Sequence, residues 1–294
     1  MASSRKVIGI TTGDAAGIGP EVVRAALSSG RLDAAFEYRV IGDAGAGVPG
    51  RPTRASAKAA FAALEEAAGL AESGDIAAVV TAPVSKARMH EVGFDFPGQT
   101  EFFATRWKTP DFAMCLTGGT LTVALVTAHI PLREVADALT GDGIVRTGRL
   151  LETFCRLRLG RSARLAVAGL NPHAGESGDL GREEIEVIAP AVSRLSESPH
   201  AEWSGPFAPD TIFHRAVAGE FDAVLCMYHD QGLIPLKLHA FDSGVNVTLG
   251  LPHPRTSPDH GTAFEIAGRG VARPDSMIAA IHLAAELLRK THAA

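Results

Sequence analysis

Short apolar runs alternate with longer segments of helical periodicity along this chain. Runs rich in Val, Ile, Leu and Ala predict β-strands at residues 7–12, 38–41, 76–81, 120–127, 165–170, 223–227 and 245–249. Apolar residues at helical spacing predict helices at 20–27, 57–70, 143–157, 182–195 and 276–288. Strands of this kind are buried on both faces, and their alternation with helices indicates an α/β protein with a largely parallel sheet or sheets.

The chain length bears on the number of domains. With 294 residues the chain is longer than one compact core usually requires, so we expect two domains or one large α/β domain. Residues 42–54, rich in Gly, Pro and Ala, predict a surface loop. No stretch has the composition of a linker, so two domains would require the chain to cross between them more than once.

Composition excludes several classes of protein. Hydrophobic residues make up 46% of the chain and charged residues 21%, as in ordinary globular proteins. The formal net charge of -5 comes without a Lys/Arg run, so we expect no nucleic-acid partner. The N-terminus lacks a signal-peptide core and no apolar stretch reaches roughly 18 residues, so we expect no membrane association and a cytoplasmic location. The cysteines Cys115, Cys155 and Cys226 include no Cys-x-x-Cys pair, which argues against disulfides and indicates a reducing compartment.

Three histidines occupy equivalent places in the pattern. His129, His173 and His229 each come directly after a predicted buried strand. A single histidine in such a place is most often a hydrogen-bonded loop residue. Because ligands bind at the carboxyl ends of parallel strands, however, three imidazoles with the same context predict a site for a divalent metal such as Zn, Co, Ni or Fe.

The loop at residues 14–21 joins the first predicted strand to the first predicted helix. Pro20 suits the start of a helix, and the glycines allow close backbone approach. Helix N-termini favour anions, so the loop could cradle a phosphate, but it matches neither a Walker loop nor the Gly-x-Gly-x-x-Gly fingerprint. A tight strand-to-helix turn explains the same residues equally well.

A few polar residues could bind or activate a substrate. Lys237, Asn246 and Arg255 could hold a phosphate or carboxylate through charge-assisted hydrogen bonds, although most Lys and Arg side chains are merely solvated. Asp210 and Asp230 could accept a proton, although loop and capping roles are commoner for such carboxylates.

Five long strings make the pattern specific. They are GDAAGIGPE at 13–21, TAPVSK at 81–86, GLNPHAGE at 169–176, MYHDQG at 227–232 and RTSPDHGTA at 255–263. Together they resemble the 4-hydroxythreonine-4-phosphate dehydrogenase (PdxA) family of pyridoxal phosphate biosynthesis, and the resemblance runs almost end to end.

The resemblance implies a fold. It is that of isocitrate and isopropylmalate dehydrogenases, with two α/β/α domains, a cleft between them, and an active site completed across a homodimer. On this pattern the first domain comprises residues 1–115 plus 245–294, and the second comprises 116–244. The late string is similar to the adenosine-binding loop of those enzymes, which assigns NAD or NADP binding to His260, Gly261, Thr262 and Ala263.

The resemblance also implies roles at the active site. One divalent metal (Zn, Mg or Co) would be held by His129, His173 and His229, with one of these ligands supplied by the neighbouring subunit. The small phosphorylated substrate would contact Gln99, Thr100, Lys237, Asn246 and Arg255, and the catalytic residues would be Asp210, near the reacting carbon, and Lys237.

One position departs from the family pattern. Where the family usually reads Gly-His-Thr-Glu, this chain has Gly98-Gln99-Thr100-Glu101. Gln99 can form hydrogen bonds to a phosphate or hydroxyl, but it cannot carry a positive charge. Weaker phosphate binding or a different substrate would follow from this change.

The predicted reaction is the metal-dependent, NAD(P)-linked oxidation of 4-phosphohydroxy-L-threonine to its 3-oxo acid, followed by decarboxylation to 3-amino-2-oxopropyl phosphate. One alternative is a sibling dehydrogenase acting on threonate or erythronate 4-phosphate or on a cis-dihydrodiol, which Gln99 keeps open. A second alternative is a metal-dependent lyase or hydrolase that uses the histidines without nicotinamide. A non-catalytic binding protein would not need three such histidines beside cationic residues.

Overall fold

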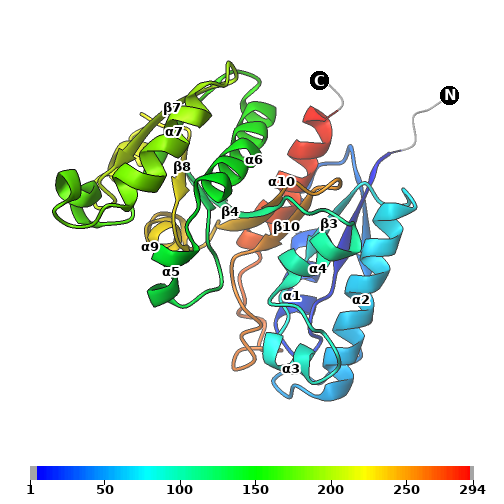
Figure 1. Cartoon of the computed structure of the whole chain (residues 1–294). Coiled ribbons are helices and arrows are strands. Elements are labelled where there is room, and N and C mark those ends of the chain that lie inside the picture. The colour runs from blue at the N-terminus through cyan, green and yellow to red at the C-terminus, as the bar shows by residue number, and fades with distance from the viewer. Residues whose placement is uncertain (1–4, 292–294) are drawn as a thin grey trace. The chain divides into compact units, whose positions relative to one another are not determined.

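The computed structural model describes residues 5–291, which divide between two compact units. Unit 1 combines Met1–Pro110 with Val245–Ala294, and unit 2 is Asp111–Gly244. The chain therefore leaves unit 1 once and returns to it (Figure 1). The first predicted crossing, at 115/116, lies inside strand β4 (Ala113–Gly118), whereas the boundary between the units precedes that strand.

The sheet of unit 1 is mainly parallel. Its strands lie in the order β2-β1-β3-β10-β9, and only β9 is antiparallel to its neighbour. Their bounds are β1 Val7–Thr11, β2 Glu37–Ile41, β3 Ala78–Thr81, β9 Val245–Leu249 and β10 Arg255–Pro258. All four residues of β3 and all four of β10 are buried, as expected for strands covered on both faces.

The helices of unit 1 form two groups. Helix α10 packs on β3, β9 and β10 with α1 beside it, and α2 packs on β1, β2 and β3 with α3 beside it. Their bounds are α1 Gly19–Ser28, α2 Arg54–Glu72, α3 Lys86–His90, α4 Gln99–Arg106 and α10 Asp275–Lys290. Helix α2 starts at a capping box, in which the side chains of Thr53 and Ser56 each accept a hydrogen bond from the other's backbone N–H.

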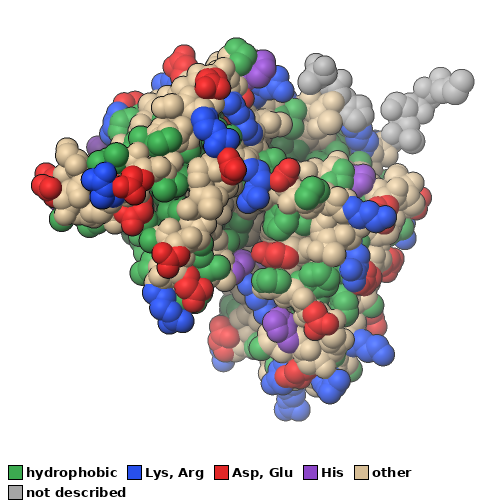
Figure 2. Space-filling model, viewed as in Figure 1, with side chains coloured by type: hydrophobic (Ala, Val, Ile, Leu, Met, Phe, Trp, Pro, Cys, Tyr) green, Lys and Arg blue, Asp and Glu red, His purple; other side chains and the backbone are tan. Residues whose placement is uncertain are grey.

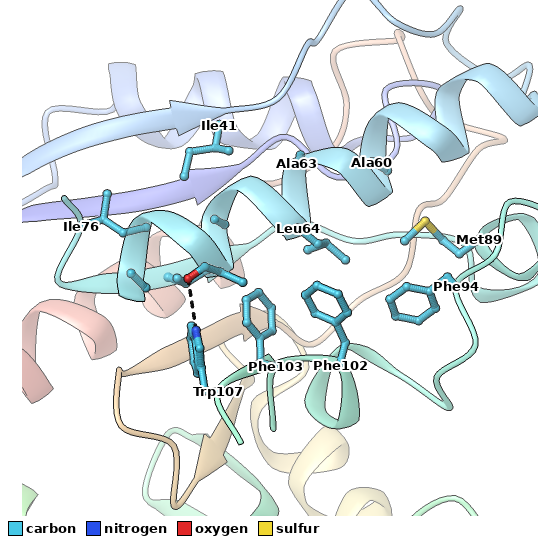
Figure 3. Packing of buried hydrophobic residues seen from close by; sticks show 14 residues of the cluster. Ile41, Ala60, Ala63, Leu64, Ile76, Met89, Phe94, Phe102, Phe103 and Trp107 are labelled. Atoms are coloured by element: carbon cyan, nitrogen blue, oxygen red, sulfur yellow. Dashed lines mark hydrogen bonds between the residues drawn. The ribbon is translucent and has the colours of Figure 1, made fainter. Parts of the chain in front are cut away.

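Aromatic rings fill the space between α2 and α4. Phe94, Phe102, Phe103 and Trp107 lie side by side against the alanine-rich face of α2 (Figure 3). The indole N–H of Trp107 donates to the carbonyl of Ala68, 3.2 Å away, which satisfies its polar atom inside the core. Burial of each ring contributes about 1.5–3 kcal/mol. This packing fixes α4, which starts at Gln99.

In unit 2 the strands lie in the order β4-β5-β8-β6-β7. Strands β4 and β5 form an antiparallel hairpin, while β5, β8, β6 and β7 are parallel neighbours. The bounds are β4 Ala113–Gly118, β5 Leu121–Leu125, β6 Ala163–Ala168, β7 Ala201–Phe207 and β8 Ala223–Cys226. Strands β5 and β8 are buried throughout.

Helices also cover the strands of unit 2. Helix α6 packs on β4, β5, β6 and β8 with α7 beside it, while α8 and α9 contact β5 and β8 and share a hydrophobic cluster with them. The bounds are α5 Val135–Ala138, α6 Gly141–Leu159, α7 Ala189–Ser196, α8 Ile212–Val217 and α9 His229–Ala240. Short 3-10 segments occupy Leu132–Glu134 and Pro172–Gly178, and a π-helical turn occupies Glu184–Ile188.

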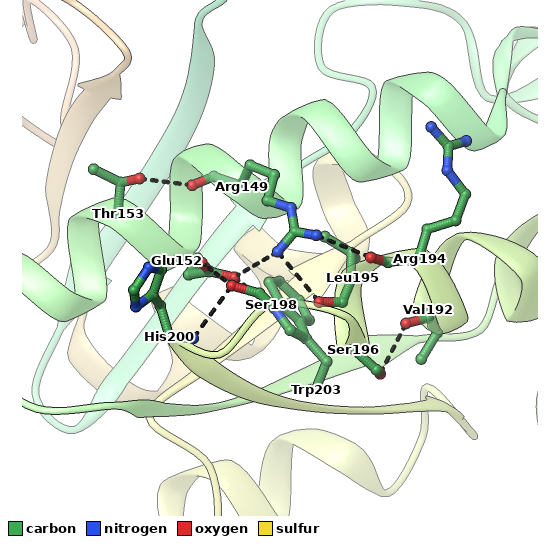
Figure 4. A network of polar contacts seen from close by, with 10 residues as sticks. All are labelled: Arg149, Glu152, Thr153, Val192, Arg194, Leu195, Ser196, Ser198, His200 and Trp203. Carbon is green, nitrogen blue, oxygen red and sulfur yellow. Dashed lines mark hydrogen bonds and ion pairs between the residues drawn. The ribbon is translucent and has the colours of Figure 1, made fainter.

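A buried carboxylate on α6 joins this helix to Ser198 and Trp203 of the same unit. Glu152 accepts hydrogen bonds from Trp203 Nε1 at 3.0 Å and Ser198 Oγ at 2.6 Å, and pairs with Arg149 at 3.1 Å (Figure 4). Burial alone would raise the pKa of Glu152, but these hydrogen bonds and the Arg149 charge outweigh it and lower the pKa. Glu152 is therefore a charged structural link in the scaffold of unit 2.

The α/β fold class is confirmed, and each predicted strand corresponds to an observed one. The loop predicted at 42–54 is confirmed up to residue 53, where only an isolated bridge joins Val48 and Arg51, and α2 starts at Arg54. The helical stretch predicted near 182–195 is present, and its first part, Glu184–Ile188, is a π-helical turn that runs directly into α7. Periodicity also missed the strands β4, β7 and β10 and the helices α3, α4, α5, α8 and α9.

The surface is mixed in charge. Acidic and basic side chains intermingle over the face in Figure 2, and no block of one sign gathers there. Among residues 5–291, no helix combines the length and apolar character needed to span a membrane.

Candidate active site

Four predicted site residues follow four adjacent parallel strands of unit 2. His129 comes after β5, His229 after β8, His173 after β6 and Asp210 after β7, and this is the order of these strands across the sheet. Because parallel strands all end at the same edge, the topology gathers these residues along one edge of the sheet.

Two of the histidines lie together. The rings of His129 and His229 are 5.6 Å apart between centroids. They share a pocket lined by Ala128, His129, Ile130, Leu132, Val135, Tyr228, His229 and Asp230. His229 Nδ1 lies 2.7 Å from Asp230 Oδ1, a contact that orients the imidazole and leaves Nε2 as the nitrogen for a metal. Burial raises the pKa of Tyr228, so its phenol is protonated at neutral pH.

His173 sits in an unusual backbone segment. Residues 173–177 all have positive φ, between 44° and 80°, and only Gly175 among them is a glycine. An L-residue in this left-handed region costs about 1–2 kcal/mol, so surrounding contacts must hold the segment in place. We call residues 173–177 the left-handed turn.

Two residues near the histidines were not singled out from the sequence. Glu184 is 3% exposed and accepts hydrogen bonds from the backbone of the segment that carries His173. Gln231 is buried, accepts from the Met227 N–H at 2.7 Å and donates to the Gly169 carbonyl at 2.6 Å. The loop that carries His173 is therefore joined to the strand end that carries His229. Both residues lie close in sequence to the histidine strings, but only the folded chain gives them these contacts.

The donor chemistry of this region suits a divalent metal. Neutral imidazoles bind Zn, Co and related ions, and the pocket brings two of them together. Within residues 5–291 of one chain, however, no group of three or more His, Cys, Asp or Glu side chains is arranged to hold a metal ion. A complete ligand set made by three histidines stays a prediction.

Unit 1 contains an enclosed cationic site. Arg255, 2% exposed, donates to Thr81 Oγ1 at 2.6 Å, to Gln99 Oε1 at 2.9 Å and to Thr248 Oγ1 at 3.4 Å. Burial lowers the pKa of Arg255 to about 10, which the charge of Glu101 counteracts in part, so Arg255 remains a cation at pH 7.

The neighbours of Arg255 include other predicted substrate contacts. Thr100 Oγ1 lies 3.3 Å from Thr248 Oγ1, and Asn246 on β9 lies opposite Ser257 on β10. The Nε of Arg255 and Oδ1 of Asn246 are buried without hydrogen-bond partners. A buried polar atom of this kind is stabilised when a ligand supplies the missing hydrogen bond, which fits an oxyanion ligand at Arg255.

The predicted nucleotide loop packs on the glycine-rich loop after β1. The Ile18 N–H donates to the Thr262 carbonyl at 2.9 Å, and a side chain at Gly17 would lie only 2.7 Å from that oxygen. The ring nitrogen Nε2 of His260 is buried and has no hydrogen-bond partner, which fits a ligand at this loop. The glycines at 13–21 therefore serve close loop packing, the structural alternative that the sequence left open.

Two predicted catalytic residues stand apart from these contacts. Asp210 is exposed in the turn before α8, and Lys237 lies on α9, which starts at His229. Gln99, Thr100 and Arg255 are brought together in unit 1, whereas the histidines, Asp210 and Lys237 belong to unit 2.

Comparisons with known proteins agree with the predicted family. Residues 20–284 match the family model described as pyridoxal phosphate biosynthetic protein PdxA. The 4-hydroxythreonine-4-phosphate dehydrogenase of Caulobacter vibrioides is 43% identical, with 95% of this chain and 97% of the relative aligned. The family resemblance is therefore confirmed.

Solved structures agree as well. A crystal structure of 4-hydroxythreonine-4-phosphate dehydrogenase from Klebsiella pneumoniae is similar to this chain, with a TM-score of 0.80, 37% identity, and coverage of 96% of this chain and 99% of that one. A terephthalate 1,2-cis-dihydrodiol dehydrogenase from Burkholderia xenovorans LB400 has a TM-score of 0.68 and 27% identity, with coverage of 96% and 98%. An isocitrate dehydrogenase from Methylococcus capsulatus, 16% identical with a TM-score of 0.54 and coverage of 98% and 89%, shares the fold alone.

Proposed function

This chain belongs to the PdxA family, and we propose that it oxidises 4-phosphohydroxy-L-threonine with NAD or NADP in pyridoxal phosphate biosynthesis. The product is the 3-oxo acid, which loses carbon dioxide to give 3-amino-2-oxopropyl phosphate. Besides family membership, the observation that carries the proposal is the pair of imidazoles, His129 and His229, facing one pocket at the ends of adjacent parallel strands.

Residues of unit 2 would hold the metal. His129, His173 and His229 are the proposed ligands, and the Asp230 carboxylate orients the His229 ring. A divalent ion such as Zn, Mg or Co supplies Lewis-acid chemistry that lowers the pKa of a substrate hydroxyl. Asp210, exposed at the end of β7, accepts the hydroxyl proton, and Lys237 binds the substrate as a point charge.

Residues of unit 1 would bind the anionic group of the substrate and the nucleotide. Arg255 offers a buried cation whose position is set by Thr81 and Gln99, and Thr100 and Asn246 add neutral polar groups. The proposed nucleotide loop comprises His260, Gly261, Thr262 and Ala263. NAD bound there would accept the hydride. The buried, unpartnered atoms of Arg255, Asn246 and His260 support both assignments.

We also propose a homodimer that shares its active site. Helix α9 starts at His229 and carries exposed apolar side chains at Ile234 (66% exposed) and Leu238 (88%), and Phe241, directly after the helix, is 73% exposed. Such a stripe is typical of a covered interface. A second copy that covers α9 would lie beside His229, which suits a ligand set that the described part of one chain does not complete. The buried free thiols of Cys115, Cys155 and Cys226 fit a cytoplasmic location.

The direct test is reduced-nicotinamide absorbance with 4-phosphohydroxy-L-threonine, NAD and a divalent metal, compared with chelator-treated enzyme. We expect metal-dependent NADH formation in the wild type. His173→Ala should lose turnover and bound metal, whereas His214→Ala, which changes an exposed histidine of the same unit, should keep both. Full activity in His173→Ala would exclude the metal assignment.

A second candidate activity is the oxidation of a related substrate in the same site. Gln99, together with the likeness to a cis-dihydrodiol dehydrogenase, favours testing threonate 4-phosphate, erythronate 4-phosphate and a ring cis-dihydrodiol. A higher kcat/KM for one of these than for 4-phosphohydroxy-L-threonine would replace the first proposal. A metal-dependent lyase or hydrolase would instead show no rise in Tm with NAD, because only a ligand that binds the folded state stabilises it.

A further inference from the structure

One side chain, Glu184, accepts several hydrogen bonds from the residues just before the left-handed turn. The Oε1 atom of Glu184 accepts from the N–H groups of Leu170 and Asn171, both at 2.7 Å, and its Oε2 atom accepts from Asn171 Nδ2 at 2.9 Å. These donors lie in the three residues that precede His173. One buried carboxylate therefore fixes the backbone entry to the turn.

The chain is shaped to admit this carboxylate. A Cβ added at Gly169 would lie 3.0 Å from Glu184 Oε1, and one added at Gly175 would lie 2.7 Å from Oε2. Glycine stands on both sides of the carboxylate, before the turn and inside it. Glu184 itself opens the π-helical turn Glu184–Ile188, a geometry that is often found at functional sites.

The same segment is also connected to the other histidine strands. The Gly169 carbonyl accepts from Gln231 Nε2, and Gln231 Oε1 accepts from the Met227 N–H just before His229. Glu184 and Gln231 thus hold opposite sides of one short stretch, residues 169–171. The place of His173 relative to His229 is set by these two buried side chains.

We propose that Glu184 is a positioning residue that holds the left-handed turn, and with it the His173 imidazole, ready for the metal before the metal binds. The proposal rests on the proposed function, because it takes His173 as a metal ligand. The neighbouring Glu183 serves as its counterpart: its carboxylate accepts from Asn171 Nδ2 at 2.7 Å and from backbone N–H groups of Arg182 and Glu183 itself, whereas the Leu170 and Asn171 N–H groups donate to Glu184. A carboxylate at 184, not negative charge in general, is what the turn requires.

The experiment compares Glu184→Ala and Glu184→Gln with two controls. Glu183→Gln removes the adjacent charge, and Glu152→Gln alters a buried glutamate of the same unit far from the histidine strings in sequence. Hydrogen exchange is measured on metal-free protein, and Zn²⁺ affinity is measured by titration against a chelating dye. Thermal melts report how much of each variant is folded.

In Glu184→Ala we expect the amides of Leu170 and Asn171 to exchange at least 10-fold faster and Zn²⁺ to bind 10- to 100-fold more weakly. Glu184→Gln keeps an acceptor oxygen but turns an N–H donor toward Asn171 Nδ2, so it should lie between Ala and wild type and serves if the Ala variant does not fold. Glu183→Gln should stay within about threefold of wild type in both measurements. Glu152→Gln should lower the Tm without weakening Zn²⁺ binding.

The proposal would be overturned if both Glu184 variants fold and keep the amide exchange rates and the Zn²⁺ affinity of the wild type. An equal loss of Zn²⁺ affinity in Glu152→Gln would also overturn it, because the effect would then be one of general stability. Failure of the wild type itself to bind Zn²⁺ would contradict the proposed function instead. The exchange of the Leu170 and Asn171 amides would still decide whether Glu184 holds the turn.

Discussion

The two proposed ligand-binding regions of this chain are built in opposite ways. In unit 1, Arg255 is enclosed and its partners, Thr81, Gln99 and Thr248, all come from the same unit. In unit 2, His129 and His229 lie in an open pocket, and the described residues of one chain supply no third ligand beside them. A buried guanidinium must take its hydrogen bonds from the folded chain or from a ligand, whereas imidazoles near the surface can be solvated.

The largest expected effect comes from removing the enclosed cation. Arg255→Met should lower kcat/KM for the phosphorylated substrate by about 10³-fold, because a buried charge-assisted contact to an anion is worth about 2–5 kcal/mol. Arg106→Met is the matched control, since Arg106 pairs with Glu65 at the end of α4 opposite to Gln99. Steady-state kinetics measure both variants, and equal losses would show that Arg255 has no special role.

The next effect tests whether unit 2 depends on a second copy. Leu238→Glu places a charge in the exposed apolar stripe of α9 and should shift a dimer to monomer in sedimentation velocity at micromolar concentration. In the same Leu238→Glu variant, Zn²⁺ should bind at least 10-fold more weakly than in the wild type. Leu159→Glu, at another exposed leucine of unit 2, should change neither measurement. A monomeric Leu238→Glu variant with wild-type Zn²⁺ affinity would separate the metal site from the interface.

A third change addresses the scaffold of unit 2. Glu152→Ala leaves Trp203 Nε1, Ser198 Oγ and Arg149 without their shared acceptor. We expect the free energy of unfolding to fall by about 2–4 kcal/mol, measured by urea denaturation. An unchanged stability would mean that water replaces the carboxylate at little cost.

Acid stability depends on a carboxylate of the same unit. Burial would raise the pKa of Asp222, but hydrogen bonds from Arg161 and Arg164 reverse this and lower it to about 2, from 3.8. Its contribution is therefore present above the unfolded pKa and is lost as the pH falls toward about 2. Asp222→Asn should be less stable than wild type by about 1–2 kcal/mol at pH 7, and the difference should shrink below about pH 4. Urea melts at pH 7, 5 and 3 measure it, and a difference independent of pH would contradict the assignment.

The smallest effect concerns Gln99. Gln99→His places an imidazole beside Arg255, whose charge opposes its protonation, so extra affinity for the phosphorylated substrate should appear only at acidic pH. We expect KM to fall about threefold at pH 5.5 relative to wild type and to match wild type above pH 7. Gln99→Glu, which adds the opposite charge, should raise KM at both pH values.

The sequence predicted much of the fold for a local reason. Apolar runs such as 223–227 must be buried on both faces, and this requirement is visible in the composition of each run. The strands β7 and β10 were not predicted because they contain Gly, Pro or polar residues. Arg255 in β10 is buried only because it has partners on other elements. Helix α9 was not predicted because the residues at its start, around His229, have the composition of a loop and because Pro235 lies inside it.

By itself, the sequence predicted that three histidines follow strands and that Arg255 could bind an anion, but it did not predict the strand that precedes Asp210. Only the tertiary structure decided which strands are neighbours, because the order β5-β8-β6-β7 is set by packing between segments far apart in the chain. The tertiary structure also determines the left-handed turn at His173, because Ala, Glu and Ser do not favour this backbone conformation by themselves. Just before that turn, a carboxylate and an amide from two other segments, Glu184 and Gln231, form hydrogen bonds to residues 169–171.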